Sequence, residues 1–113
     1  MASENIDAVA EIALAANEQF TSAHPGAETS VGVISPTLRS MGVQADAVNI
    51  DCGHSGKRLV LILLDQNPDR VGIGIGQKET IGDYELIRQM RIEDLDMSDV
   101  LELLEARFIV NKP

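Results

Sequence analysis

Residues 58–76, RLVLILLDQNPDRVGIGIG, decide the fold of this chain. The segment Leu59–Leu64 is apolar at every position, whereas residues 71–76 alternate valine or isoleucine with glycine. Between them, Gln66–Arg70 has the turn-forming residues of a hairpin loop. The stretch therefore predicts two antiparallel strands, Arg58–Asp65 and Val71–Lys78.

The glycines of the second strand share one face, because strand side chains alternate between the two faces of a sheet. If Asp65 faces Val71 across the loop, three apolar residues of the first strand stand beside them: Leu64, Ile62 and Val60 beside Gly72, Gly74 and Gly76. A row of glycines indicates that another group comes close. Three explanations fit this close-packing or groove position: the alanine-rich N-terminal helix, a strongly bent or bulged strand, or a shallow ligand groove.

Helices are predicted near both ends of the chain and once between them. Apolar residues at helical spacing indicate a helix over Glu4–Phe20, capped by Ser3. A last helix is expected to begin with Ser98 as its cap. Ser35 before a proline indicates the cap of a short helix, Pro36–Met41.

Strands are predicted in the middle of the chain. Alternating residues indicate strands over Val43–Cys52 and Tyr84–Ile92, with Glu79–Asp83 as a loop, while Thr29–Ile34 fits either a strand or one helical turn. Elements of one kind cluster along the chain, which favours an α+β fold. We expect a single domain over residues 1–113, in which an antiparallel β-meander of three or four strands packs with an N-terminal helix, a C-terminal helix and one extra short helix.

The apolar strand Leu59–Leu64 needs cover on both of its faces. The two long helices could cover one face together, or one face each. If both lie on the same face, the other face needs a partner, and a homodimer through that face is then expected.

The amino-acid composition limits the kinds of partner that this protein is expected to bind. Nine basic and eighteen acidic residues give a net charge of −9, which repels nucleic acid and anionic membranes. Such a surface suits solubility, a basic protein partner or mimicry of nucleic-acid charge, and an acidic solvated surface with no special partner is the ordinary interpretation. Phe20, Tyr84 and Phe108 are the only aromatic residues, too few for a base-stacking platform. No leader or long apolar segment is evident, so a cytoplasmic protein without a membrane partner is expected.

Reactive side chains concentrate in residues 51–58, DCGHSGKR. The candidate ligand-binding residues are Cys52, His54, Ser55, Lys57 and Arg58. Backbone N–H groups of this turn, with Lys57 and Arg58, could hold an anion. Cys52 with His54 could be a thiol nucleophile and its base, although a cysteine on the inner face of a strand is more often a small core residue.

Known catalytic and cofactor motifs do not fit this chain. Only two residues separate Gly53 from Gly56, where a P-loop has four, and Lys57 stands where a nucleophile elbow has its last glycine. Gln77 occupies the third glycine position of a dinucleotide fingerprint. No paired metal-ligand spacing is present either. We therefore predict no catalytic residue, no metal site and no cofactor.

Three classes of function are compatible with these residues. The favoured one is a small acidic, non-enzymatic protein-binding domain of the adaptor, chaperone or inhibitor kind. The second is a small-ligand or anion-binding domain, or a thiol-dependent enzyme, centred on the turn from Cys52 to Arg58. The third is a structural subunit of a homo-oligomer.

Overall fold

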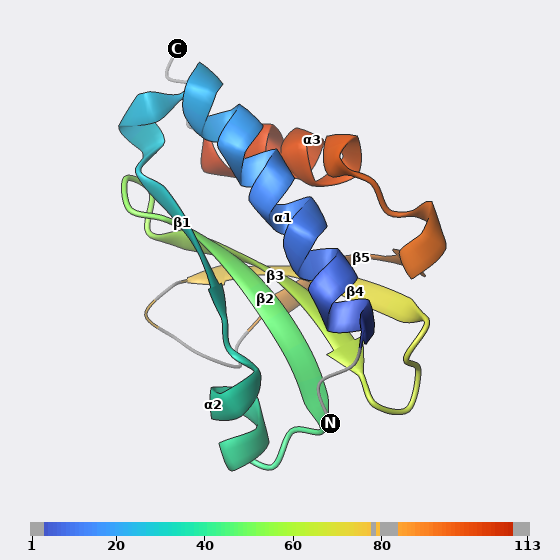
Figure 1. Ribbon diagram of the computed structural model, residues 1–113. Helices are drawn as coiled ribbons and strands as arrows, with labels where there is room; N and C mark the ends of the chain where they lie inside the picture. The colour runs from blue at the N-terminus through green and yellow to red at the C-terminus, as the bar shows by residue number, and fades with distance from the viewer. Residues whose placement is uncertain (1–3, 78, 80–83, 110–113) are drawn as a thin grey trace.

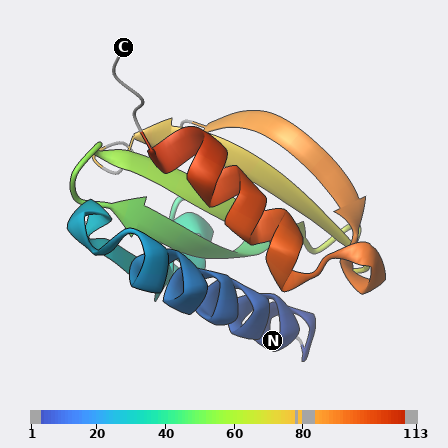
Figure 2. The same cartoon turned by 90° about the horizontal axis from the view of Figure 1, so that it is seen from above.

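One antiparallel sheet carries the fold, and two long helices lie together on one of its faces (Figures 1 and 2). The computed structural model describes residues 4–77, 79 and 84–109. The strands follow one another in the order β1-β2-β3-β4-β5, every neighbouring pair antiparallel. The elements are α1 (Glu4–Ala23), η1 (Pro25–Ala27), β1 (Thr29–Val33), α2 (Ser35–Ser40), β2 (Ala45–Cys52), β3 (Lys57–Leu64), β4 (Arg70–Gln77), β5 (Tyr84–Arg91), η2 (Ile92–Asp94) and α3 (Met97–Phe108).

The predicted α+β meander is confirmed, with five strands instead of three or four. The additional strand is β1, which lies in the segment that fitted either a strand or a helical turn. It pairs with β2 from Thr29 opposite Cys52 to Val33 opposite Val48. Because β1 begins directly after η1, the chain leaves α1 and enters the sheet at its edge.

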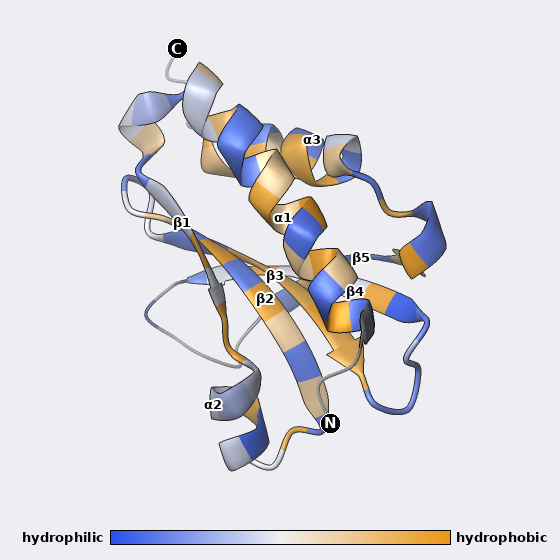
Figure 3. Cartoon of the chain, in the orientation of Figure 1, coloured by the Kyte–Doolittle hydropathy of each residue, from blue (hydrophilic) through white to orange (hydrophobic). Residues whose placement is uncertain are grey.

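The helix layer and one sheet face share the main core. α1 buries residues at helical spacing, from Ile6 through Val9 and Ala13 to Phe20. Phe20 meets Phe108 of α3 edge to face, with ring centroids 6.1 Å apart. These helices cover the sheet residues that alternate toward them, which are Val48, Ile50, Cys52, Leu59, Leu61, Leu63, Val71 and Ile73. Figure 3 shows the arrow of β3 in the colour of hydrophobic residues beneath this layer.

The N-cap residues of α2 and α3 are not the serines that were predicted. The predicted cap of the first helix, Ser3, lies outside the described residues. Ile34 is the N-cap of α2, and the Ser35 hydroxyl instead accepts a hydrogen bond from the Ala47 N–H at 2.9 Å. Asp96 rather than Ser98 caps α3, because Asp96 and Asp99 form a reciprocal capping box. Ser98 lies inside the helix and donates to Asp96 Oδ1.

The β3–β4 hairpin closes two residues out of the predicted register. Gly72 pairs with Ile62 instead of Leu64, and the following pairs shift with it. Asp65 does not extend β3 toward Val71, since its N–H donates to the Gln44 carbonyl at 3.1 Å and its carboxylate binds Arg39 of α2 at 2.9 Å. The loop therefore lies between Leu64 and Arg70.

The glycine row lies on the face that α1 and α3 leave free, hereafter the second face. Of the three explanations for this row, cover by the N-terminal helix is therefore wrong. Side chains of β5 lean over it instead: a Cβ at Gly72 would lie 3.2 Å from Leu86 Cδ1, and a Cβ at Gly74 would lie 3.1 Å from Tyr84 Cβ. The strand pair is also bulged, because Ile73 pairs with Arg88 and Gly74 with Leu86, which leaves one extra residue in β5.

Candidate functional site

The reactive residues predicted around Cys52 do not converge on one point. Cys52 ends β2 on the helix side and is 0% exposed. Its Sγ donates to the Ala27 carbonyl at 3.3 Å and lies 3.5 Å from the Ser55 N–H. His54 is exposed on the turn beyond, where its backbone N–H also donates to the Ala27 carbonyl. The thiol is thus held among backbone groups, and no described side chain forms a hydrogen bond with it.

Lys57 and Arg58 leave this turn in opposite directions, because they are neighbours on a strand. Lys57 Nζ donates to the Arg107 carbonyl at 3.2 Å, in the last turn of α3, where a cation is favoured. Arg58 lies on the second face. The Ser55 hydroxyl accepts from the Lys57 N–H at 3.3 Å and so shapes the turn itself.

A hollow of about 340 Å³ lies beside this turn and contains both histidines of the chain. His24 and His54 line it with Phe108. His24 Nε2 lies 3.4 Å from the Glu105 carboxylate, and its ring packs on Phe20. Among the residues that the structure describes, no three histidine, cysteine, aspartate or glutamate side chains are placed to hold a metal ion.

The second face contains a buried ion pair. Asp51 and Arg58 are directly opposite on β2 and β3, and the carboxylate binds the guanidinium through both oxygens, at 2.6 Å from Nε and 2.9 Å from Nη2. Arg58 is only 7% exposed. The Asp51 carboxylate raises the pKa of Arg58 above its ordinary value.

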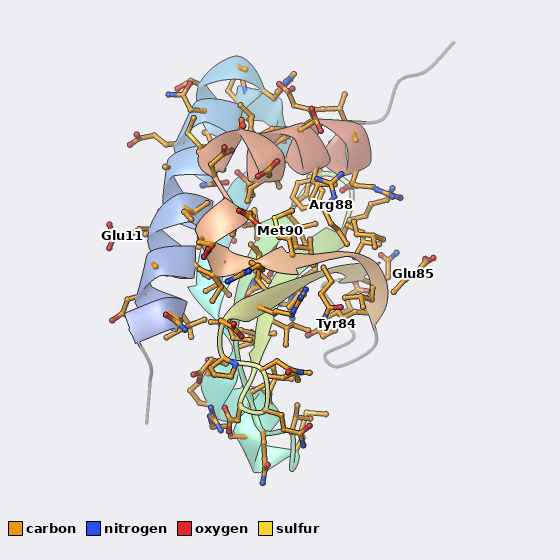
Figure 4. The ribbon with its side chains drawn as sticks, turned by 90° about the vertical axis from the view of Figure 1, so that its right-hand side faces the viewer. Glu11, Tyr84, Glu85, Arg88 and Met90 are labelled. Atoms are coloured by element: carbon orange, nitrogen blue, oxygen red, sulfur yellow. The ribbon has the colours of Figure 1, made fainter. Side chains whose placement is uncertain are left out.

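Tyr84 reaches the middle of the second face because β4 has glycine there. Tyr84 belongs to β5 and is paired with Gly76 of β4. Its side chain crosses the glycine row and packs toward the cluster that contains Val60 and Ile62. Figure 4 shows it on one side of β5, with Arg88 and Met90 on the side that faces the helices. Among the residues that the structure describes, its hydroxyl, Arg58 Nη1 and Asn49 Oδ1 are buried and have no hydrogen-bond partner.

The short helix α2 covers a second part of this face. Ile34 and Leu38 pack against Ala47 and Val60. Arg39 ties the helix to the sheet, since its guanidinium lies 3.1 Å from the Asp46 carboxylate and 2.9 Å from that of Asp65. Cover by α2 and Tyr84 explains why Val60 is fully buried although no long helix lies above it.

The hairpin end of the second face stays open and forms an apolar hollow of about 140 Å³, hereafter the hairpin hollow. Ile62, Leu64 and Leu86 form its walls above Gly72. Leu86 of β5 is 61% exposed and Leu64 of β3 is 43% exposed, and both line this hollow. The polar rim consists of Asn67, Arg70 and Gln89.

Charge is divided unequally between the two layers. α1 and α3, with the N-cap of α3, contain eight acidic residues and one basic residue, whereas the five strands contain five basic and three acidic residues. Exposed carboxylates on the helices are Asp7, Glu11, Glu18, Glu102 and Glu105. The net charge of −9 is therefore mainly a property of the helix layer, and the second face does not share it.

Comparison with known proteins adds no assignment, since the chain matches no protein-family model, no curated protein and no solved structure. None of the described helices is both long enough and apolar enough to cross a membrane.

The sequence contained a partial signal for the hairpin hollow. Gly72 and Leu64 were already placed on one face, but Leu86 on a third strand could not be located without the register of β5. That register depends on the bulge, which moves Leu86 to a position opposite Gly74. The hollow is therefore a feature that only the paired strands create.

Proposed function

We propose that this protein is a non-enzymatic protein-binding domain and that the hairpin end of its second face is the binding surface. One observation carries this assignment: both long helices cover the same sheet face, and the opposite face exposes Leu64 and Leu86 around an apolar hollow. Exposed apolar side chains grouped around a concave site are typical of interaction surfaces.

The energetics support a binding role. Burying a leucine side chain fully contributes about 1.5–3 kcal/mol, so covering the exposed parts of Leu64 and Leu86 would contribute roughly 2 kcal/mol. That amount is modest, and it suits the anchor of a larger interface. The basic partner expected from the net charge stays a prediction, and the exposed carboxylates of α1 and α3 would be its contact. The homodimer also stays a prediction.

A photo-crosslinking residue placed at Gln89, on the rim of the hairpin hollow, tests this assignment. Added to an extract of cells that naturally make the protein, this variant should yield a discrete adduct. The same residue placed at Glu102, on exposed α3, is the matched control. Introducing Leu86→Arg should remove the adduct formed from position 89. An adduct no stronger than that from position 102, or one that survives Leu86→Arg, would contradict the assignment.

A further inference from the structure

Two arginines stand opposite each other beside the hairpin hollow. Arg70 and Arg91 are direct partners in the ladder of β4 and β5, and like charges in that position destabilise a sheet. Arg91 has Glu93 at 3.4 Å. Arg70 forms no side-chain hydrogen bond or ion pair within the described part of the chain.

Acidic residues outnumber basic residues two to one in this chain, yet Arg70, like Arg88 and Arg107, forms no ion pair within the described residues. Arg58, which is buried on the same face, is neutralised by a two-oxygen contact to Asp51, whereas Arg70 is exposed at the end of β4. Arg70 lines the hairpin hollow directly. A carboxylate from outside the chain would give Arg70 the partner that it lacks and would reduce its repulsion with Arg91.

The size of the hollow limits the apolar part of the ligand. Its volume of about 140 Å³ is close to that of an engineered cavity of about 150 Å³ that holds one benzene molecule. One aromatic ring or one branched aliphatic side chain therefore fits between Ile62 and Leu86, whereas a whole helix face does not. Leu86 leans over the base of the hollow at Gly72, since a Cβ there would lie 3.2 Å from Leu86 Cδ1.

On the basis of the proposed function, we propose that the hairpin hollow recognises an extended peptide segment of a partner protein. An aromatic or branched aliphatic residue of the segment enters the hollow, and the carboxylate of an adjacent aspartate or glutamate binds Arg70. Two contacts at a fixed spacing select this class of segment: the apolar walls hold the first side chain, and the guanidinium of Arg70 donates hydrogen bonds to the carboxylate of the second.

Titration of the labelled protein with the peptide acetyl-Gly-Phe-Asp-Gly-amide tests the proposal, with amide chemical shifts as the readout. Shifts should centre on the strand ends around Gly72 and Leu86. The matched peptide with asparagine in place of aspartate should bind about fivefold more weakly, the upper range for an exposed ion pair. Arg70→Gln should remove this difference, whereas Arg88→Gln, on the helix side of β5, should preserve it.

Gly72→Ala supplies a second variant, because its methyl group enters the hollow and should weaken both peptides. Equal binding of the two peptides by the natural protein, or a difference that persists in Arg70→Gln, would overturn the proposal. Sedimentation that shows a dimer broken by Leu86→Arg would also overturn it, because a second copy would then be the occupant. If the adduct from position 89 still forms while the peptides fail, the binding surface stands and only its ligand class is wrong.

Discussion

A methyl group added at Gly74 tests whether β5 depends on the glycine row. The Cβ of Gly74→Ala would lie 3.1 Å from Tyr84 Cβ and 3.4 Å from the Glu85 carbonyl oxygen. Neither atom can be moved by rotating a side-chain tip, so β5 itself must shift. The substitution should therefore loosen the strand that carries Tyr84 and Leu86 over the second face.

The expected magnitude follows from two opposing effects. Added volume in a closely packed place costs about 1–3 kcal/mol. Replacing glycine with alanine also restricts the unfolded chain, which stabilises by about 0.4–1 kcal/mol. We expect Gly74→Ala to lower the free energy of unfolding by about 1–2 kcal/mol. Gly72→Ala should lower it by less than about 1 kcal/mol, because the atom it approaches is the flexible end of Leu86.

Urea unfolding followed by far-ultraviolet circular dichroism measures these differences. Gly26→Ala is the control, since nothing lies within 4 Å of an added Cβ there, and it should leave stability unchanged or raise it. The order of stability should be Gly26→Ala, then Gly72→Ala, then Gly74→Ala. If Gly74→Ala is as stable as Gly26→Ala, the packing of β5 over the glycine row is refuted.

Three further outcomes are expected. A thiol reagent should leave Cys52 unmodified in the native protein and react after unfolding, because the thiol is 0% exposed; rapid native reaction would revive the thiol-enzyme alternative. Asp51→Ala should lower the free energy of unfolding by about 2–3 kcal/mol, because it leaves the buried Arg58 without its carboxylate. Urea unfolding measures this loss, and the same measurement should give a smaller loss for Arg39→Ala. Hydrogen bonds from Ser98 and Asp99 lower the pKa of Asp96 in the folded protein. The stabilisation that the Asp96 carboxylate gives to the folded protein is therefore complete above the pKa of the unfolded chain, about 3.9. It is lost as the pH falls through the lower pKa of the folded state. The stability difference between the natural protein and Asp96→Asn should shrink over that acidic range, and a difference independent of pH would contradict this.

The sheet and the helices were predictable because they depend on local periodicity. Alternation in residues 71–76 and helical spacing in residues 4–20 persist over enough positions to indicate the element type. Caps were less predictable, because Ser98 and Asp96 are both good N-cap residues. The reciprocal bond between Asp96 and Asp99 decides between them, and it exists only in the folded helix start.

The site was less predictable than the fold. Reactive residues that are neighbours in the sequence, such as Cys52 and Arg58, end on opposite faces of the sheet, so their proximity along the chain did not imply a shared site. Conversely, Arg70 and Leu86 belong to different strands and meet at one hollow. Such meetings depend on strand register, which Asp65 shifted through contacts with residues from another part of the chain.

By itself, the sequence determined an acidic α+β domain with an antiparallel meander and an apolar central strand that needs cover on both faces. Only the tertiary structure decided how that cover is arranged. Both long helices pack on the isoleucine side, because β5 already fills the glycine row with Tyr84 and Leu86. The physical reason is that periodicity is local along the chain, whereas the choice of face, the register and the bulge arise from contacts between distant segments. Those contacts left the hairpin hollow and Arg70 open to a partner.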